Sequence, residues 1–145
     1  AADPKKTFVI PKPETPAPHF NFAPLLNAAA ELREASASFS RAASALAEGS
    51  ISLTKEDQER LNRILYRTER AFIREGGLPG RPWFRHQIYA PGQYTGYSVK
   101  TLPGVREALE QRNWDTVETQ IRIAAKYIES FSSEIDRATT LILGN

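Results

Sequence analysis

The chain carries apolar residues at helical spacing in several stretches, and one long segment rich in proline and glycine interrupts them. In the first stretch, from Pro24 to about Gly49, apolar residues recur every three or four positions, which predicts an amphipathic helix. The members of this stripe are Leu25, Ala28, Leu32, Ala35, Phe39, Ala42 and Leu46. Many alanines and serines accompany them, so a neighbouring helix could approach closely.

A second helix is expected after a connection over residues 50–53. Thr54 followed by Asp57 is typical of a helix N-cap with an acidic residue at the third position. We expect this helix to end at Gly76-Gly77. Its inward positions are predicted to be Leu61, Ile64, Leu65, Thr68, Ala71 and Phe72.

The C-terminal part predicts a short helix from about Val105 to Gln111 and a long one that starts near Asn113. The stripe of the long helix is Trp114, Val117, Ile121, Ala124, Ile128, Phe131, Ile135, Ala138 and Ile142. At 1.5 Å per residue this helix would be roughly 40 Å long. Ile123 and Tyr127 lie off the stripe, which predicts packing against more than one neighbour.

Residues 76–103 lack this periodicity and contain several prolines and glycines. A loop of this length is uncommon in a compact domain and usually has a function. The pattern therefore predicts an all-α fold over residues 24–145: a bundle of about four helices, with a long irregular loop inserted before the short third helix.

Residues 1–23 are expected to form a proline-rich extended linker or strap, because proline fixes φ and removes amide donors. Its prolines, with the one that opens the first helix, are Pro4, Pro11, Pro13, Pro16, Pro18 and Pro24. The apolar run 8–10 could lie along another surface.

Composition narrows the functional classes. The 145 residues fit one domain, and a net charge of +2 is weak support for an anionic partner. With no cysteine, disulfides, thiol catalysis and thiolate metal sites are excluded. His19 and His86 are far apart, and no metalloprotease, phosphate-loop or nucleophile-elbow motif is present. We expect no catalytic residue, metal ligand or cofactor in this chain, and no contact of this domain with a membrane.

Nucleic-acid binding is one alternative, because arginines recur along one face of the predicted second helix. They are Arg60, Arg63, Arg67, Arg70 and Arg74. Acids nearly balance the cations between Lys55 and Glu75, so few counterions would be released from a duplex. A solvated or interface face is the better interpretation.

The long loop is different, because the span from Gly76 to Arg106 contains cations and no acid. The cations are Arg81, Arg85, Lys100 and Arg106, and the interleaved aromatic residues are Trp83, Phe84, Tyr89, Tyr94 and Tyr97. Such a surface could receive a carboxylate or dock on an acidic neighbour. Alternatively, the aromatic residues only fix the loop to the bundle while the cations pair with distant acids.

The loop also carries a family resemblance. The run RPWFRHQIYAP at 81–91, followed by LPGV at 102–105, resembles the RH-x-I-Y-A-P … F-P-G-I segment of the transferrin receptor and glutamate carboxypeptidase group. In that family the segment belongs to a C-terminal helical dimerisation domain. The resemblance implies that the loop-motif residues dock the loop: Arg81, Trp83, Arg85, His86, Tyr89, Pro91, Pro103 and Gly104.

The resemblance also implies a parent protein. A two-zinc peptidase-like domain and an apical domain would precede this chain, with all zinc ligands outside it. The partners would be a second copy, in a homodimer, and the upstream protease-like domain. Most family members act outside the cytoplasm.

In the carboxypeptidase branch, a Lys-Tyr pair on this loop holds the C-terminal glutamate of the substrate. By resemblance Tyr97 takes the tyrosine position, whereas Gly96 replaces the lysine and puts glutamate specificity in doubt. Lys100 could supply a cation from another point of the loop. A free-standing helical adaptor without a peptidase parent is the alternative function.

Overall fold

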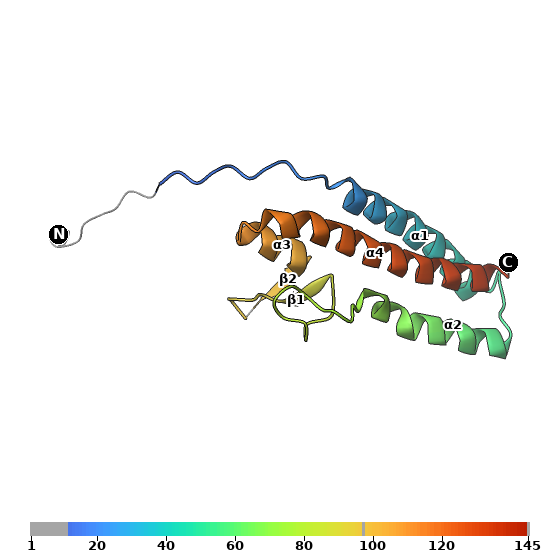
Figure 1. The fold of residues 1–145 in the computed structure, drawn as a ribbon. Coiled ribbons are helices and arrows are strands. Elements are labelled where there is room, and N and C mark those ends of the chain that lie inside the picture. Colours follow the sequence, from blue (N-terminus) through green and yellow to red (C-terminus); the bar gives the residue numbers. More distant parts are fainter. Residues whose placement is uncertain (1–11, 97, 145) are drawn as a thin grey trace, which may run out of the picture.

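The computed structural model describes residues 12–96 and 98–144. Its α-helices are α1 (Ala23–Ala47), α2 (Lys55–Thr68), α3 (Pro103–Glu110) and α4 (Trp114–Leu143), as Figure 1 shows. A 3₁₀ turn, η1 (Glu69–Phe72), follows α2, and two short strands, β1 (Tyr89–Pro91) and β2 (Val99–Thr101), lie between α2 and α3. The predicted four-helix architecture, with the loop before the short third helix, is confirmed.

Helix α4 is the centre of the bundle. It lies between α1 and α2 in Figure 1, and it also packs against α3 and η1. Its apolar stripe faces these neighbours, with Val117, Ile121 and Ala138 almost fully buried. Ile123 and Tyr127 are half-buried, as expected of a helix with neighbours on more than one side.

Helices α1 and α4 approach closely because the contact positions of α1 are small. Ala28, Ala35 and Ala42 are all buried, at seven-residue intervals along one face. The predicted stripe of the first helix is therefore confirmed. Two separate apolar clusters form along the contact, one around Ala28 and one around Ala42.

The second helix is shorter than the sequence predicts. Thr54 caps it as expected, accepting from the Asp57 amide at 3.1 Å, but the α-helix ends at Thr68 rather than at Gly76. After η1 the chain turns into an extended conformation at Ile73, which forms a bridge with His86. The 3₁₀ turn η1 and the pairing of Ile73 with the returning loop take the place of the last two turns of the predicted helix. The expectation that Leu65 points inward is wrong, since this side chain is 39% exposed.

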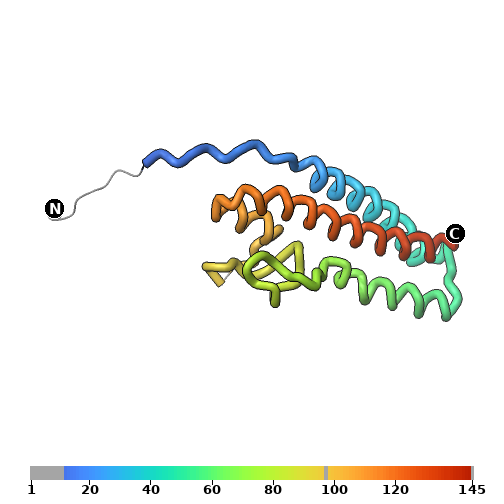
Figure 2. The backbone as a smooth tube through the Cα atoms, in the orientation of Figure 1, coloured from blue at the N-terminus to red at the C-terminus, as the bar shows by residue number. Residues whose placement is uncertain are grey.

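The loop predicted to be irregular contains a small antiparallel hairpin. Tyr89 pairs with Thr101 and Pro91 with Val99. Figure 2 shows that the hairpin and loop lie at the end of the bundle away from the C-terminus. Three-residue strands carry too little alternation to be distinguished from loop by sequence pattern.

The N-terminal segment has no regular secondary structure over residues 12–22. It nevertheless contacts the bundle, because the Phe20 and Trp114 rings lie 5.8 Å apart and Arg112 donates to Glu14. The bundle core thus begins at Phe20, a few residues before the first helix. The apolar run 8–10 lies outside the described residues.

Candidate docking loop

A buried ion pair fixes the loop to helix α3. Arg81 Nη2 lies 2.7 Å from Glu107 Oε1, and the two side chains are only 4% and 7% exposed. Each of the two buried charges is compensated by the other. An unpaired charge in such a place would be costly. This pair connects the start of the loop motif with the helix that follows the loop.

The pair belongs to a larger hydrogen-bond network. Arg81 Nη1 donates to the Pro91 carbonyl at 2.5 Å, and its guanidinium lies 4.9 Å from the centre of the Phe84 ring. Glu107 also accepts from the backbone amide of Gln93 at 2.9 Å. One carboxylate therefore holds two points of the loop, at Arg81 and at Gln93.

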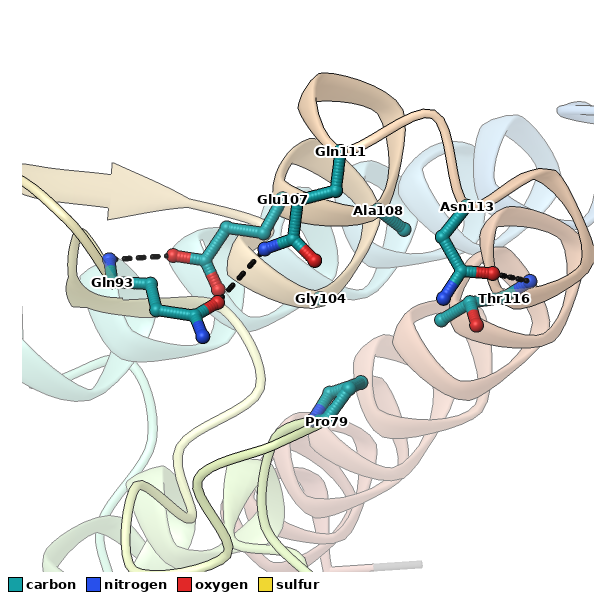
Figure 3. A pocket seen from close by; sticks show the side chains of 8 residues that line it. All are labelled: Pro79, Gln93, Gly104, Glu107, Ala108, Gln111, Asn113 and Thr116. Carbon is teal, nitrogen blue, oxygen red and sulfur yellow. Dashed lines mark hydrogen bonds between the residues drawn. The ribbon is translucent and has the colours of Figure 1, made fainter.

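The same network borders a small pocket, drawn in Figure 3. It is lined by Pro79, Gln93, Gly104, Glu107, Ala108, Gln111, Asn113 and Thr116. Its volume is about 30 Å³, roughly room for one water molecule and far below the size of a ligand site. Gln111 donates to Gln93 at 2.9 Å beside it. The network therefore holds the loop on α3, and the pocket beside it is too small for a substrate.

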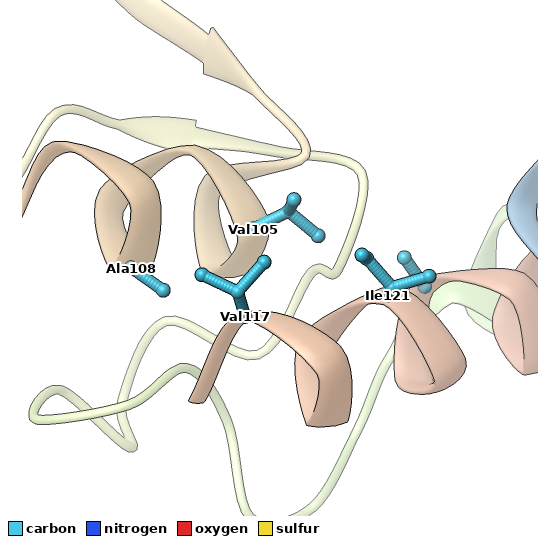
Figure 4. Close-up of a cluster of buried hydrophobic side chains, with 5 residues drawn as sticks. Val105, Ala108, Val117 and Ile121 are labelled. Carbon is cyan, nitrogen blue, oxygen red and sulfur yellow. The ribbon is translucent and has the colours of Figure 1, made fainter. Parts of the chain in front are cut away.

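The second motif, Pro103-Gly104, opens α3 and packs on α4. Figure 4 shows Val105 and Ala108 of α3 against Val117 and Ile121 of α4. A Cβ on Gly104 would lie 2.3 Å from Gln120 Oε1, so glycine allows the close approach. Pro103 is fully buried. These two motif residues have a packing role.

A polar group of three residues lies where η1 meets the loop. His86 Nδ1 accepts from the backbone amides of Ile88 and Tyr89, and the Tyr89 hydroxyl donates to Glu69. His86 Nε2 is 3.8 Å from Glu69 Oε1. Burial lowers the pKa of His86, and the Glu69 charge opposes this shift. The lowered pKa favours the neutral ring, and Nδ1 as an acceptor orders the turn into β1.

Lys100 and Tyr97 are the residues expected to bind substrate, and Arg85 is expected to dock the loop. Lys100 Nζ lies 2.5 Å from Glu110 Oε2 on α3, so its charge is already paired. Tyr97 lies outside the described residues. Arg85 donates weakly to the Arg74 carbonyl at 3.4 Å, and its residue is exposed.

The aromatic residues of the loop divide into two groups. Phe84 is half-buried under Arg81, whereas Trp83 is 70% and Tyr94 is 80% exposed. Val99 on β2 is 68% exposed. Two loop cations therefore pair with acids of α3, as one interpretation expected, but the most exposed aromatic residues do not fix the loop to the bundle. The most exposed apolar and aromatic side chains of the loop are thus Trp83, Tyr94 and Val99.

The predicted arginine face does not extend along one helix. Arg60, Arg63 and Arg67 lie on α2, but Arg70 lies in η1 and Arg74 donates to the Gly77 carbonyl at 2.8 Å. The early end of α2 therefore breaks the series.

Residues 12–96 and 98–144 contain no group of three or more His, Asp or Glu side chains that could hold a metal ion. In the same residues no helix has the length and apolarity needed to cross a membrane.

Glu107, Glu69 and Gln93 were not predicted as site residues. The signal for Glu107 was indirect: an acid-free cationic loop must find its counter-charges elsewhere, and the nearest acids along the sequence are Glu75 before the loop and Glu107 and Glu110 after it. Which of Glu107 and Glu110 would be buried required the structure.

The described residues form a mostly helical bundle, with a small two-stranded hairpin between α2 and α3. Comparison with known families is specific: the model of the transferrin receptor-like dimerisation domain matches residues 20–136. The chain belongs to this family.

Its relatives are much longer proteins. It is 41% identical over 78 residues to a "Probable glutamate carboxypeptidase" of Arthroderma benhamiae, which covers 54% of this chain and 10% of the relative. A "Probable glutamate carboxypeptidase" of Arabidopsis thaliana is 38% identical over 42% of this chain and 10% of its own length. An "Inactive zinc metalloprotease" of Schizosaccharomyces pombe is 31% identical over 53% of this chain and 10% of its own length. The chain thus spans about a tenth of each relative.

Proposed function

We propose that this chain is the noncatalytic homodimerisation domain of a glutamate carboxypeptidase-like protein. The observation that carries the proposal is the family match over residues 20–136, combined with a bundle whose long helix has neighbours on several sides. Catalysis and zinc binding would lie in a separate peptidase-like domain, since two of the named relatives are carboxypeptidases and another is an inactive zinc metalloprotease.

The loop would contact that peptidase-like domain and contribute to its substrate pocket. Its support is the exposure of Trp83 and Tyr94 on a loop that Glu107 holds at Arg81 and Gln93. A pre-ordered loop with exposed aromatic residues loses little conformational entropy on docking. Tyr97 is the residue proposed to reach the substrate, on the basis of the motif alone.

Lys100 is the less favourable candidate for binding a substrate carboxylate. Its ammonium group already pairs with Glu110, and a substrate would have to replace that partner. The residue at the lysine position of the family's pair is Gly96, which has no side chain to carry a cation. Its φ is +62, and nothing lies near its Cβ position. Preference for a C-terminal glutamate is therefore not part of the proposal.

Self-association is tested by the molar mass of the chain in solution, measured by light scattering over a concentration series. A mass that rises toward twice the 16.2 kDa chain mass supports the dimerisation role. A mass that stays at one chain up to millimolar concentration contradicts self-association by this chain and favours a monomeric adaptor.

The pocket role needs the complete parent protein. Tyr97→Phe is expected to raise KM for peptides with an acidic C-terminus while dimer mass is unchanged. Unaltered kinetics on these peptides would remove Tyr97 from the pocket.

A further inference from the structure

The outer face of α4 separates charge across its width. One groove, between α1 and α4, is lined by acids and small residues with no base. Its lining residues are Glu31, Glu34, Ala35, Ser38, Glu129, Ser132, Ser133 and Asp136.

The other groove, between α2 and α4, is basic. It is lined by Arg60, Arg63, Ile64, Arg67, Glu134 and Arg137. Its one acid, Glu134, is already paired with Arg137 at 2.8 Å along the same helix. Arg63 and Arg67 are exposed on α2.

The two grooves are parts of one continuous face. Asp136, which lines the acidic groove, also lines a hollow with Arg60 and Thr140 on the α2 side. In Figure 1, α4 runs between α1 and α2 along their length, so its exposed ridge separates the grooves. Ser133 and Thr140 on this ridge are exposed and small. Their small side chains leave room for a second helix at these two positions, next to the charged side chains of Asp136 and Arg137.

Such a face is complementary to itself. In an isologous dimer each copy presents the same patch, so an acidic half must meet a basic half for the charges to match. A twofold axis parallel to α4 does this: it places the acidic groove of each copy over the basic groove of its partner. An axis across α4 would place acid on acid and base on base.

We infer that two copies of this chain associate through this face, with their α4 helices parallel and side by side. This inference rests on the proposed homodimer and names the surface that would form it. The occupant is a second copy because one face carries both halves of the complementary pair. Opposed potentials set orientation and exclude wrong registers.

The test uses two charge-reversed variants of the full chain. The first replaces the basic half, Arg63→Glu with Arg67→Glu, and the second replaces the acidic half, Glu31→Lys with Glu34→Lys. Each variant alone would oppose like charges at both symmetric contacts, and its dimer dissociation constant should rise at least about tenfold. Mixed in equal amounts, the variants should form a heterodimer, because one is acidic throughout the face and the other basic.

A matched control for the first variant carries the same change of charge outside both grooves. Arg33→Glu with Arg106→Glu alters two exposed arginines that line neither groove. This control should keep the mass of the unaltered chain. Circular dichroism should show all variants folded.

The parallel orientation has its own readout, since the chain contains no cysteine. Ser133→Cys and Thr140→Cys lie about 10 Å apart along the helix. In the parallel arrangement each should cross-link to its own copy under mild oxidation. An antiparallel arrangement would cross-link at most one of them, and Ser40→Cys, on the far side of α1, should cross-link in neither.

The possible outcomes separate the two proposals. Loss of dimer in each variant and its recovery on mixing support the inferred face. Dimers of unchanged affinity in both variants would overturn the face and leave self-association intact. A monomeric unaltered chain would contradict the homodimer itself.

Discussion

Replacing Glu107 by glutamine tests the idea that one buried carboxylate holds the loop. The change is isosteric and removes only the negative charge. Arg81 would then remain about 4% exposed with its charge unbalanced. Removing one member of a buried pair costs about 3–5 kcal/mol, and the retained amide oxygen places this variant near about 3 kcal/mol. That is a large fraction of the roughly 5–15 kcal/mol available to a domain.

Glu110→Gln is the matched control, one helical turn away on α3. Its carboxylate also pairs with a loop cation, Lys100, but is 52% exposed. Water already screens that pair, so the expected loss is below about 1 kcal/mol. Both variants replace a glutamate that pairs with a loop cation by glutamine, and they differ in how deeply that glutamate is buried.

Urea unfolding, followed by circular dichroism, measures both losses. The midpoint should fall strongly for Glu107→Gln with little change in slope, and its melting temperature should drop by roughly 6–12 °C. The double variant Arg81→Met with Glu107→Leu should lose less than Glu107→Gln, because no buried charge is left alone. Equal losses for the glutamine variants at 107 and 110 would refute the reasoning.

Three further outcomes are expected. Gly77→Ala should lower the free energy of unfolding by more than about 2 kcal/mol, measured by thermal unfolding, because its Cβ would lie 2.2 Å from the Pro82 carbonyl oxygen. Gly49→Ala is the control: Gly49 has a similar φ but open space around its Cβ position, so the loss should be only about 1 kcal/mol. Similar losses in the two variants would contradict the steric argument. Because the folded pKa of His86 is lowered, its contribution to stability is complete above its ordinary pKa of 6.5 and is lost as the pH falls below that value toward the folded pKa. Denaturation from pH 7.5 to 5.5 should show a shallower decline in His86→Gln, and an unchanged decline would exclude this histidine as the cause. Trp83→Ala should change the free energy of unfolding of this chain by less than about 0.5 kcal/mol, since the side chain is 70% exposed, and a larger loss would place Trp83 in the fold.

The sequence determined the helical architecture of this protein. Burial of one face at the helical period is a local rule, so Ala28, Ala35 and Ala42 could be assigned to a contact before any neighbour was known. The N-cap at Thr54 and the break before α3 were equally local. Pro103 and Gly104 are identified by motif, but the close approach of Gly104 to Gln120 is not indicated by it.

Only the tertiary structure decided where α2 ends, which acid is buried and which charges share a face. Residues 69–73 leave the α-helix because Phe72 stacks on Phe131, with ring centres 4.5 Å apart, and Ile73 pairs with His86. Both partners are distant in sequence, so no local preference indicates them. The choice of Glu107 over Glu110 depends on helix packing. So does the placement of the acidic groove and the basic groove on opposite sides of α4. Periodicity tells which side of a helix is buried, but only packing tells which neighbour lies against it.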